Sequence, residues 1–249
     1  MEYPDLDINA YLGRFDQFTQ AIEARLRPDS SVVNVLTEIN RYLFHDQGFS
    51  GNRDNYYDPR NSYLNDVLDR KLGIPILLSV IYIEVGRRLG LRVKGVNFPG
   101  HFLVRVTTPG GDLFLDPYAD GISVGVEELN LRLRKLFGAR APTLDEQPGL
   151  LNPTSSQDIL LRILRNLKLI YLHRGDVGRL LSVLDKILEI DPKSAAELRD
   201  RGRLYQQLCY SPKAVKDFKR YLELSPEAED AQDVRSTIMA LSTRRMYLH

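Results

Sequence analysis

The chain has 249 residues, 43% hydrophobic and 27% charged, which is ordinary globular composition and excludes wholesale disorder. Lys and Arg (34) nearly balance Asp and Glu (33), so the formal net charge of +1 gives no field to hold a polyanion. We therefore expect neither nucleic acid nor a membrane surface as a partner. At ~150 residues per domain, the length favours two domains.

The single cysteine, Cys209, excludes an internal disulfide framework and a multi-cysteine zinc site. It fits a reducing compartment. The first residues include several acidic side chains and no basic stretch of the kind that opens a secretory signal. The longest apolar run, residues 74–83, covers about half of a membrane span. These features predict a soluble, cytoplasmic protein.

Residues 1–72 show helical periodicity. Apolar residues recur at three- and four-residue steps from Tyr11 to Ile22, and Ser31 is a plausible cap for a helix that begins at Val32. Residues 48–61 are rich in Asn, Asp and Gly, which favours turns. A short helix is expected over residues 63–72.

Residues 75–137 have a mixed pattern. A mostly buried helix is expected over residues 75–89, with Pro75 in its first turn, where a missing N–H costs nothing. Strand patterns follow, and residues 109–112 (Pro-Gly-Gly-Asp) form a hairpin turn between the last two. The expected strands are residues 92–98, 101–107 and 113–116, and a further helix is expected over residues 126–137. This order predicts an α+β domain, and residues 138–156, which contain three prolines, are expected to be a linker.

Residues 158–249 are expected to be all-helical and contain an internal repeat. The segment 187–192 (ILEIDP) matches 221–226 (YLELSP) at an offset of 34, and the same offset links Tyr171 to Tyr205 and Leu184 to Phe218. This period resembles the tetratricopeptide repeat. We expect repeats at about 158–192 and 193–226 and a capping helix over 227–241, so the two predicted domains are residues 1–150 and 151–249.

Most apolar residues at repeat positions are expected to form the repeat core rather than a ligand site, and they include Leu164, Leu167, Tyr171, Leu180, Leu184, Leu198, Gly202, Tyr205, Ala214 and Phe218. The pattern departs from the repeat in lacking tryptophan and in having Arg201 where leucine is usual. Cys209 occupies the turn position that Gly175 holds in the first repeat. Because stacked repeats offer a concave surface, we expect a protein or peptide partner here.

Few residues suit catalysis. The four histidines, His45, His101, His173 and His249, have no metal-ligand spacing, so we expect no metal site and no cofactor. His101 opens a predicted strand, and Asp116 ends the next strand of the same hairpin, so the two should lie side by side. A carboxylate there could accept one imidazole N–H and fix the tautomer. The alternative is a hydrogen-bonded pair with a purely structural role.

This arrangement resembles the transglutaminase-like, papain-related fold, in which a helix with the nucleophilic cysteine precedes a histidine strand and an aspartate strand. Residues 95–103 (GVNFPGHFL) are the most specific part. Together with residues 65–68 (NDVL), residues 73–76 (GIPI) and the repeats, they resemble the SirB-type bacterial family, which joins such a core to tetratricopeptide repeats.

The resemblance places the nucleophile at Pro75, which has none. Ser79, one helical turn further on, is the only nearby hydroxyl, but it gains less from the helix N-terminus. His101, Asp116 and Ser79 therefore form either the remnant of a catalytic site or a displaced triad. The structural alternative for Ser79 is a hydrogen bond to the carbonyl four residues earlier, as is common in helices.

Other polar residues near this core have two interpretations. Asn55 and Tyr57 lie in the turn-rich segment and, with Pro75 and Asn97, are candidates to line a groove, although ordinary loop composition also explains the segment. A local basic run, Arg132, Arg134, Lys135 and Arg140, is expected to be the solvated face of a helix.

The sequence therefore favours a non-catalytic binding or regulatory protein that engages another protein through its groove and its repeats. The alternative is a hydrolase or acyltransferase that uses the displaced Ser79, His101 and Asp116. A third possibility is that the core only supports the repeats. The sequence indicates no oligomeric state.

Overall fold

The computed structural model describes residues 2–246, with side chains described as far as residue 243. His249 lies outside the described residues. The chain forms two compact units, residues 2–163 (the core unit) and the part from Leu164 onward (the repeat unit). The division falls inside one long helix, α6 (Ser156–Arg174), so the predicted boundary near residue 150 lies within the core unit.

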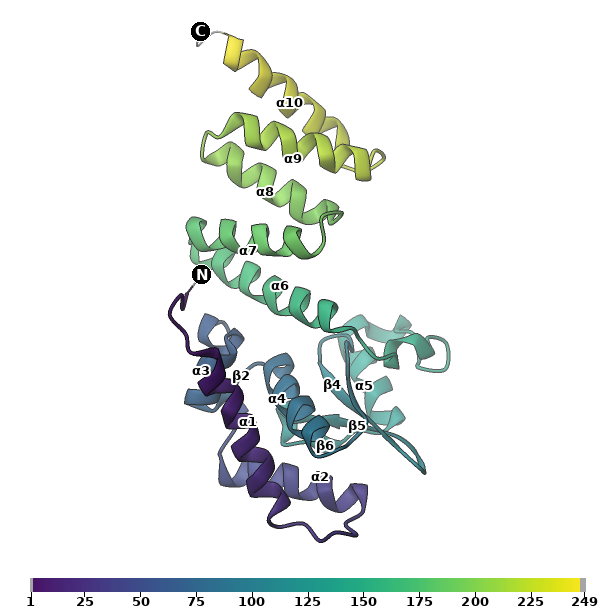
Figure 1. Ribbon diagram of the computed structural model, residues 1–249. Helices are drawn as coiled ribbons and strands as arrows, with labels where there is room; N and C mark the ends of the chain where they lie inside the picture. Colours follow the sequence, from purple (N-terminus) through teal and green to yellow (C-terminus); the bar gives the residue numbers. More distant parts are fainter. Residues whose placement is uncertain (1, 247–249) are drawn as a thin grey trace. The chain divides into compact units, whose positions relative to one another are not determined.

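The core unit combines helices with a small antiparallel sheet (Figure 1). Its helices are α1 (Ile8–Glu23), α2 (Val32–Asn40), α3 (Leu64–Arg70), α4 (Pro75–Arg88) and α5 (Val126–Phe137). Its strands are β1 (Ser50–Gly51), β2 (Leu72–Gly73), β3 (Val93–Val96), β4 (Leu103–Thr108), β5 (Gly111–Asp116) and β6 (Ile122–Ser123). The sheet is the meander β3-β4-β5-β6, all antiparallel, and β1 pairs with β2 in parallel. The predicted α+β class is confirmed.

Local sequence explains several of these boundaries. The Ser31 side chain accepts a hydrogen bond from the Asn34 N–H and caps α2, as predicted. Helix α4 begins at Pro75, also as predicted. The β4–β5 hairpin turns at residues 109–110, and Gly111 has a φ of +115°, which favours glycine.

Helix α4 is the centre of the core unit. It packs against α1, α2 and α3 and against strands β3 and β4 (Figure 1). Because neighbouring residues of a strand point to opposite faces, Val104 of β4 joins the large core around α4, whereas Leu103 joins a smaller apolar cluster with Leu129 and Leu133 of α5. Both faces of the sheet at the start of β4 are therefore covered, which fixes the position of the residues just before it.

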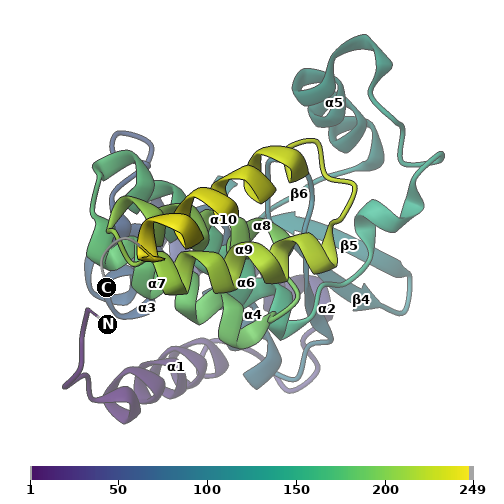
Figure 2. The same ribbon diagram turned by 90° about the horizontal axis from the view of Figure 1, so that it is seen from above.

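The repeat unit is helical, as predicted. It contains the end of α6, then α7 (Val177–Ile190), α8 (Ala195–Gln207), α9 (Ser211–Leu224) and α10 (Ala231–Met246), and α7 to α10 pack in succession (Figures 1 and 2). A Cβ on Gly202 of α8 would lie 2.7 Å from the Phe218 ring of α9, so only glycine allows this close approach.

Two departures from the repeat pattern have structural explanations. Arg201 donates to both oxygens of Asp217 at 2.7 and 2.9 Å and to Asp185 at 2.7 Å, so an ion-pair network replaces the usual leucine contact. Cys209 has a φ of +60°, close to the +65° of Gly175, so the two turns have the same left-handed backbone although only one has glycine. Cys209 is exposed, with a free thiol.

Some elements were not expected from the sequence. They are the two-residue strands β1, β2 and β6 and a π-helix at Arg41–Asp46 that extends α2. The segment expected to be a linker contains 3-10 helices at Gly138–Arg140 and Pro148–Leu151 and buries Leu144. It ends against β3, where Pro153 bridges to Val96 and the Thr154 N–H donates to Gly95 O at 2.8 Å.

Candidate functional site

His101 was predicted to be the first residue of a strand, but β4 begins two residues later, at Leu103. Residues 98–101 form a turn in which the His101 N–H donates to Phe98 O at 3.1 Å. Pro99 and Gly100 occupy its central positions, and the φ of +71° at Gly100 is the conformation that a type II turn requires there. This Pro-Gly pair therefore fixes where the His101 side chain leaves the backbone.

Asp116 ends β5 at the same end of the sheet at which β4 begins. It is 1% exposed, and its Oδ1 accepts the Tyr118 N–H at 3.1 Å, which caps the 3-10 helix Pro117–Ala119. Its Oδ2 lies 3.7 Å from His101 Nδ1. The two predicted residues are therefore neighbours, but this separation is longer than a hydrogen bond.

Arg132 of α5 occupies the place between them. Its Nη1 donates to Asp116 Oδ2 at 2.6 Å and lies 3.3 Å from His101 Nδ1. The Arg132 side chain is only 13% exposed, and Glu128, one turn earlier, accepts from its Nε at 3.1 Å. The expectation that Arg132 lies on a solvated face is wrong, because the buried carboxylate of Asp116 recruits its guanidinium from the edge of the apolar stripe.

This contact bears on the tautomer of His101. A guanidinium can only donate, so its contact with Nδ1 is a hydrogen bond only when Nδ1 carries no proton, which leaves the proton of the neutral ring on Nε2. Burial lowers the pKa of His101, and the charges of Arg132 and Arg162 lower it further, against the opposing effect of Asp116 and Glu128. Both effects favour the neutral ring at neutral pH, and the Arg132 contact favours the tautomer with the proton on Nε2.

Ser79 is fully buried, and its Oγ donates to Phe102 O at 3.1 Å. The structural alternative expected from the sequence, a hydrogen bond to the carbonyl four residues earlier in the helix, is wrong. The acceptor lies just before β4, where the chain approaches α4 closely enough to compete for the hydroxyl. Ser79 thus reaches the backbone of the residue after His101 and makes no hydrogen bond to the His101 ring in the part of the chain that the structure describes.

Pro75 occupies the first position of α4 and is partly buried. The amide N–H groups of Leu77 and Leu78 both donate to Ile74 O, at 3.1 and 3.2 Å, as in an ordinary helix start. The position that resembles the nucleophile slot therefore holds a helix-starting residue without a reactive atom.

The turn-rich segment is built around buried amides. Asn61, fully buried, donates to the carbonyls of Asn55 and Tyr56 at 2.8 and 3.2 Å and accepts from Asn52 Nδ2 at 3.0 Å. This scaffold leaves Tyr57 61% exposed, with the Tyr56 ring against it at a centroid distance of 5.4 Å.

Tyr56, in this loop, interacts electrostatically with Tyr118 and Arg162. Burial raises the pKa of Tyr56, Tyr118 raises it further, and Arg162 opposes both effects. Arg162, in the first part of α6, donates to Asn97 Oδ1, and its guanidinium lies 5.4 Å from the centroid of the Phe102 ring. Sequence reasoning did not name Arg162 and assigned Arg132 to a solvated helix face. The only available signal was that Arg132 lies beside the apolar positions of its predicted helix.

Among residues 2–246, no group of three or more His, Cys, Asp or Glu side chains converges in a way that could hold a metal ion. In the same range, no helix has the length and apolar character that a membrane crossing needs.

Comparison with known proteins agrees with this architecture. Residues 9–165 match the transglutaminase-like superfamily, and residues 167–239 match the tetratricopeptide repeat. A UPF0162 protein of Xylella fastidiosa (strain Temecula1) is 44% identical over 252 residues, covering 100% of this chain and 88% of the relative. A UPF0162 protein of Vibrio cholerae is 31% identical over 203 residues, covering 81% and 74%. The UPF0162 protein YchA of Escherichia coli K12 is 23% identical over 248 residues, covering 100% and 90%.

These matches confirm the resemblance to transglutaminase-like proteins that continue into tetratricopeptide repeats, whereas the narrower SirB-type assignment stays a prediction. With the family established over most of its length, the chain belongs to the transglutaminase-like superfamily, as a UPF0162 protein with C-terminal tetratricopeptide repeats.

Proposed function

We propose that this protein is a non-catalytic binding and regulatory protein that engages a segment of another protein through the region around His101 and through its helical repeats. The observation that carries this proposal is the contact of Arg132 with both Asp116 and His101. It takes the carboxylate away from the imidazole and favours the ring tautomer that cannot accept a proton on Nε2.

Acyl transfer needs a nucleophile, a base that accepts its proton, and a group that orients the base. Pro75 supplies no nucleophile, and the Ser79 hydroxyl is already donated to a backbone carbonyl. Asp116 does not orient His101, because its Oδ2 is hydrogen-bonded to Arg132. Each requirement fails for a separate physical reason, which favours binding over catalysis.

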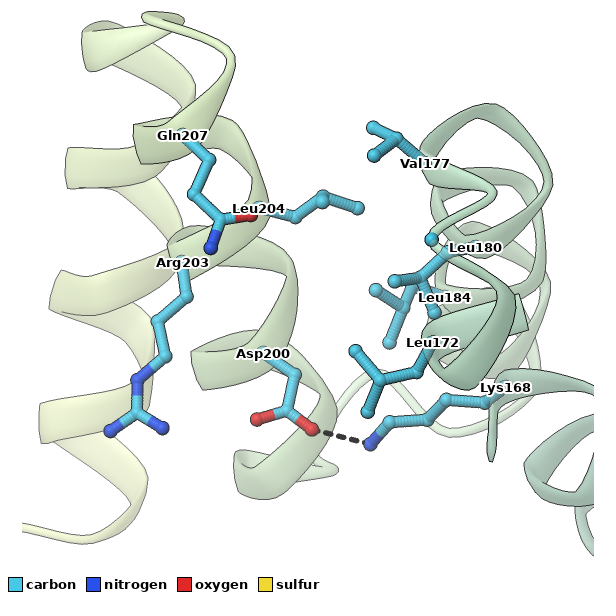
Figure 3. A pocket seen from close by; sticks show the side chains of 10 residues that line it. Lys168, Leu172, Val177, Leu180, Leu184, Asp200, Arg203, Leu204 and Gln207 are labelled. Atoms are coloured by element: carbon cyan, nitrogen blue, oxygen red, sulfur yellow. Dashed lines mark ion pairs between the residues drawn. The ribbon is translucent and has the colours of Figure 1, made fainter. Parts of the chain in front are cut away.

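The repeat unit contains a groove suited to a protein segment. A cavity of about 370 Å³ opens between the end of α6, the first part of α7 and α8, as seen in Figure 3. One side is apolar, with Leu172, Leu180 and Leu184 (Figure 3). An ion pair of 2.5 Å between Lys168 of α6, beside Leu172, and Asp200 of α8 spans the cavity (Figure 3). An apolar side chain with a polar neighbour would match this lining, because binding would remove apolar surface from water while the rim stays hydrated.

A pair of leucines on α6 makes the groove testable. Leu172 and Leu169 are 58% and 57% exposed, but only Leu172 is among the residues that line the groove. We expect Leu172→Gln to weaken association with a partner isolated with the wild-type protein, whereas Leu169→Gln preserves it. Equal effects of both substitutions would show that the partner does not use the groove.

The enzyme alternative has one observation in its favour: the Ser79 hydroxyl bonds the backbone carbonyl of Phe102, the residue that follows His101. It is tested by incubating the purified protein with amide, ester and glutamine-plus-amine substrates and with an acyl-type serine probe. We expect no turnover and no labelling of Ser79. Turnover that disappears in His101→Ala would overturn the proposal of a non-catalytic protein.

The same proposal includes the compartment. We place the protein in the bacterial cytoplasm on its single, exposed thiol and on its bacterial relatives. Fractionation of cells that produce the tagged protein tests this placement.

A further inference from the structure

The start of α6 forms part of the core unit. Pro153 and Thr154 attach this segment to the edge strand β3, and Ile159 and Ile163 pack against the large apolar core. Arg162 lies between these two isoleucines in sequence and is partly buried. Its position is therefore fixed by the fold.

The guanidinium of Arg162 has no carboxylate within 4.0 Å among the described residues. Its contacts are a hydrogen bond to the uncharged Asn97 and the face of the Phe102 ring. Burial lowers the pKa of Arg162, and Tyr56 opposes this effect. Arg132, by contrast, has both Asp116 and Glu128. Arg162 is therefore a partly buried positive charge without a carboxylate partner among the described residues.

Arg162 lies in the neighbourhood of His101, since its guanidinium is 5.4 Å from the ring centroid of Phe102, the next residue in the chain. Arg162 and Arg132 both lower the pKa of the His101 ring, whose side chain is 34% exposed and so accessible. A guanidinium has five N–H groups, of which the bond to Asn97 uses one. The neutral His101 ring adds an Nε2–H. The region therefore offers hydrogen-bond donors and the positive charge of Arg162.

We propose that Arg162, together with His101, binds the carboxylate of an acidic residue in the protein segment that the core unit receives. The planar fork of arginine matches an oxyanion in two parallel hydrogen bonds. A carboxylate carries one negative charge, which balances Arg162, whereas a phosphate carries about 1.5 to 2 and needs a second free cation. The nearby Phe102 and Tyr56 rings suit the apolar part of a peptide side chain. This inference rests on the proposed function and gives a ligand chemistry to the region around His101 in the core unit, not to the cavity in the repeat unit.

The proposal predicts a linked change in His101. A carboxylate bound at Arg162 adds a negative charge beside the ring and offsets the cations that depress its pKa, so binding raises the pKa of His101. The full-length protein, with labelled histidines, is titrated by NMR at constant ionic strength with the α-amide of N-acetylglutamate. The matching amide of N-acetylglutamine is the uncharged control, and inorganic phosphate is the second anion. His45 and His173 are internal references.

We expect the glutamate probe to raise the pKa of His101, the glutamine probe to leave it unchanged, and phosphate to bind more weakly. Arg162→Gln should weaken binding of the glutamate probe by at least about tenfold, since a charge-assisted hydrogen bond is lost. Arg162→Lys keeps the charge without the fork and should bind with intermediate affinity. Arg134→Gln, which removes an exposed charge from α5, should change nothing.

Equal responses to glutamate and glutamine, or a glutamate response that persists in Arg162→Gln, would overturn the inference. Tighter binding of phosphate would overturn the choice of a carboxylate. If no anion binds but Leu172→Gln still weakens partner binding, this inference fails while the proposed function stands. If the glutamate probe binds but Leu172→Gln and Leu169→Gln affect partner binding equally, the proposal that the partner uses the repeat-unit groove fails instead.

Discussion

Arg132→Met is the most informative single substitution. It removes the guanidinium but keeps an unbranched chain beside Asp116 and His101. Asp116 is 1% exposed and would keep only the Tyr118 N–H on Oδ1. Removing one partner of a buried ion pair costs about 3–5 kcal/mol, and the Arg132 side chain is 13% exposed, so we expect about 3 kcal/mol at neutral pH. The bond to the half-exposed Glu128 adds about 0.3–0.5 kcal/mol.

The loss should depend on pH in a defined direction. In the native protein the pKa of His101 is below the ordinary value of 6.5, so the unfolded chain binds this proton more readily. The stabilisation from a neutral His101 is therefore complete above 6.5 and is lost as the pH falls through the lowered value. In Arg132→Met the nearest cation is gone and Asp116 Oδ2 remains 3.7 Å away, so the pKa of His101 should rise.

Urea denaturation of both proteins at about pH 8 and about pH 5, with NMR titration of His101, measures both effects. The difference in unfolding free energy should be largest at the higher pH, because protonated His101 replaces Arg132 as the partner of Asp116 at the lower. A second change, Asp116→Asn, should recover much of the loss, since it removes the unpaired charge. Arg134→Met is the control. An unchanged or lower pKa of His101 in Arg132→Met would refute the reasoning.

Three further predictions concern the repeat unit, each measured by chemical denaturation. Gly202→Ala should lower the unfolding free energy by about 1–3 kcal/mol, because the added Cβ meets the Phe218 ring. The control is Gly178→Ala, whose Cβ has no neighbour closer than 3.9 Å and which should not lower it. Equal effects of the two substitutions would contradict the packing argument. Arg201→Ala should cost about 3–5 kcal/mol by leaving its buried carboxylate partner unpaired, and a neutral result would contradict that. Cys209→Gly should raise the unfolding free energy by about 0.5–1 kcal/mol, because glycine adopts the left-handed backbone of this turn without strain. A decrease in the unfolding free energy would show that the turn is unstrained in the wild type.

The elements that could be predicted are those with a local signal. Helix α4 begins at Pro75 and α5 spans residues 126–137, both as expected. Such helices can be predicted because the apolar spacing and the end residues that define them lie within one continuous segment. The 34-residue offset likewise identified Gly175 and Cys209 as equivalent, and the two backbones agree. The two-residue strands β1 and β2 have no such signal, since their pairing joins segments about twenty residues apart.

The contacts within the site are a different case, because each is a competition between groups distant in sequence. Asp116 was expected to pair with His101, and that pair is adjacent, but Arg132 outcompetes the imidazole because it is always charged and forms the shorter bond. Ser79 had a possible acceptor in its own helix and uses Phe102 O instead. The residue types and the neighbouring elements could be predicted. Which of two possible partners forms each hydrogen bond could not, because that depends on distances between groups far apart in the sequence.

The polar groups that remain at the site have a common property. Arg132 and Arg162 can only donate hydrogen bonds, and the neutral His101 ring presents its Nε2–H. The two carboxylates beside them, Asp116 and Glu128, both accept from Arg132, and Asp116 also accepts the Tyr118 N–H. A catalytic acyl-transfer site needs an acceptor for the proton of the nucleophile, whereas Asp116 Oδ2 and His101 Nδ1 are both in contact with Arg132. A set of donors that includes the positive charge of Arg162 is suited to holding an acceptor, which is why we read the same residues as a recognition site for an acidic segment.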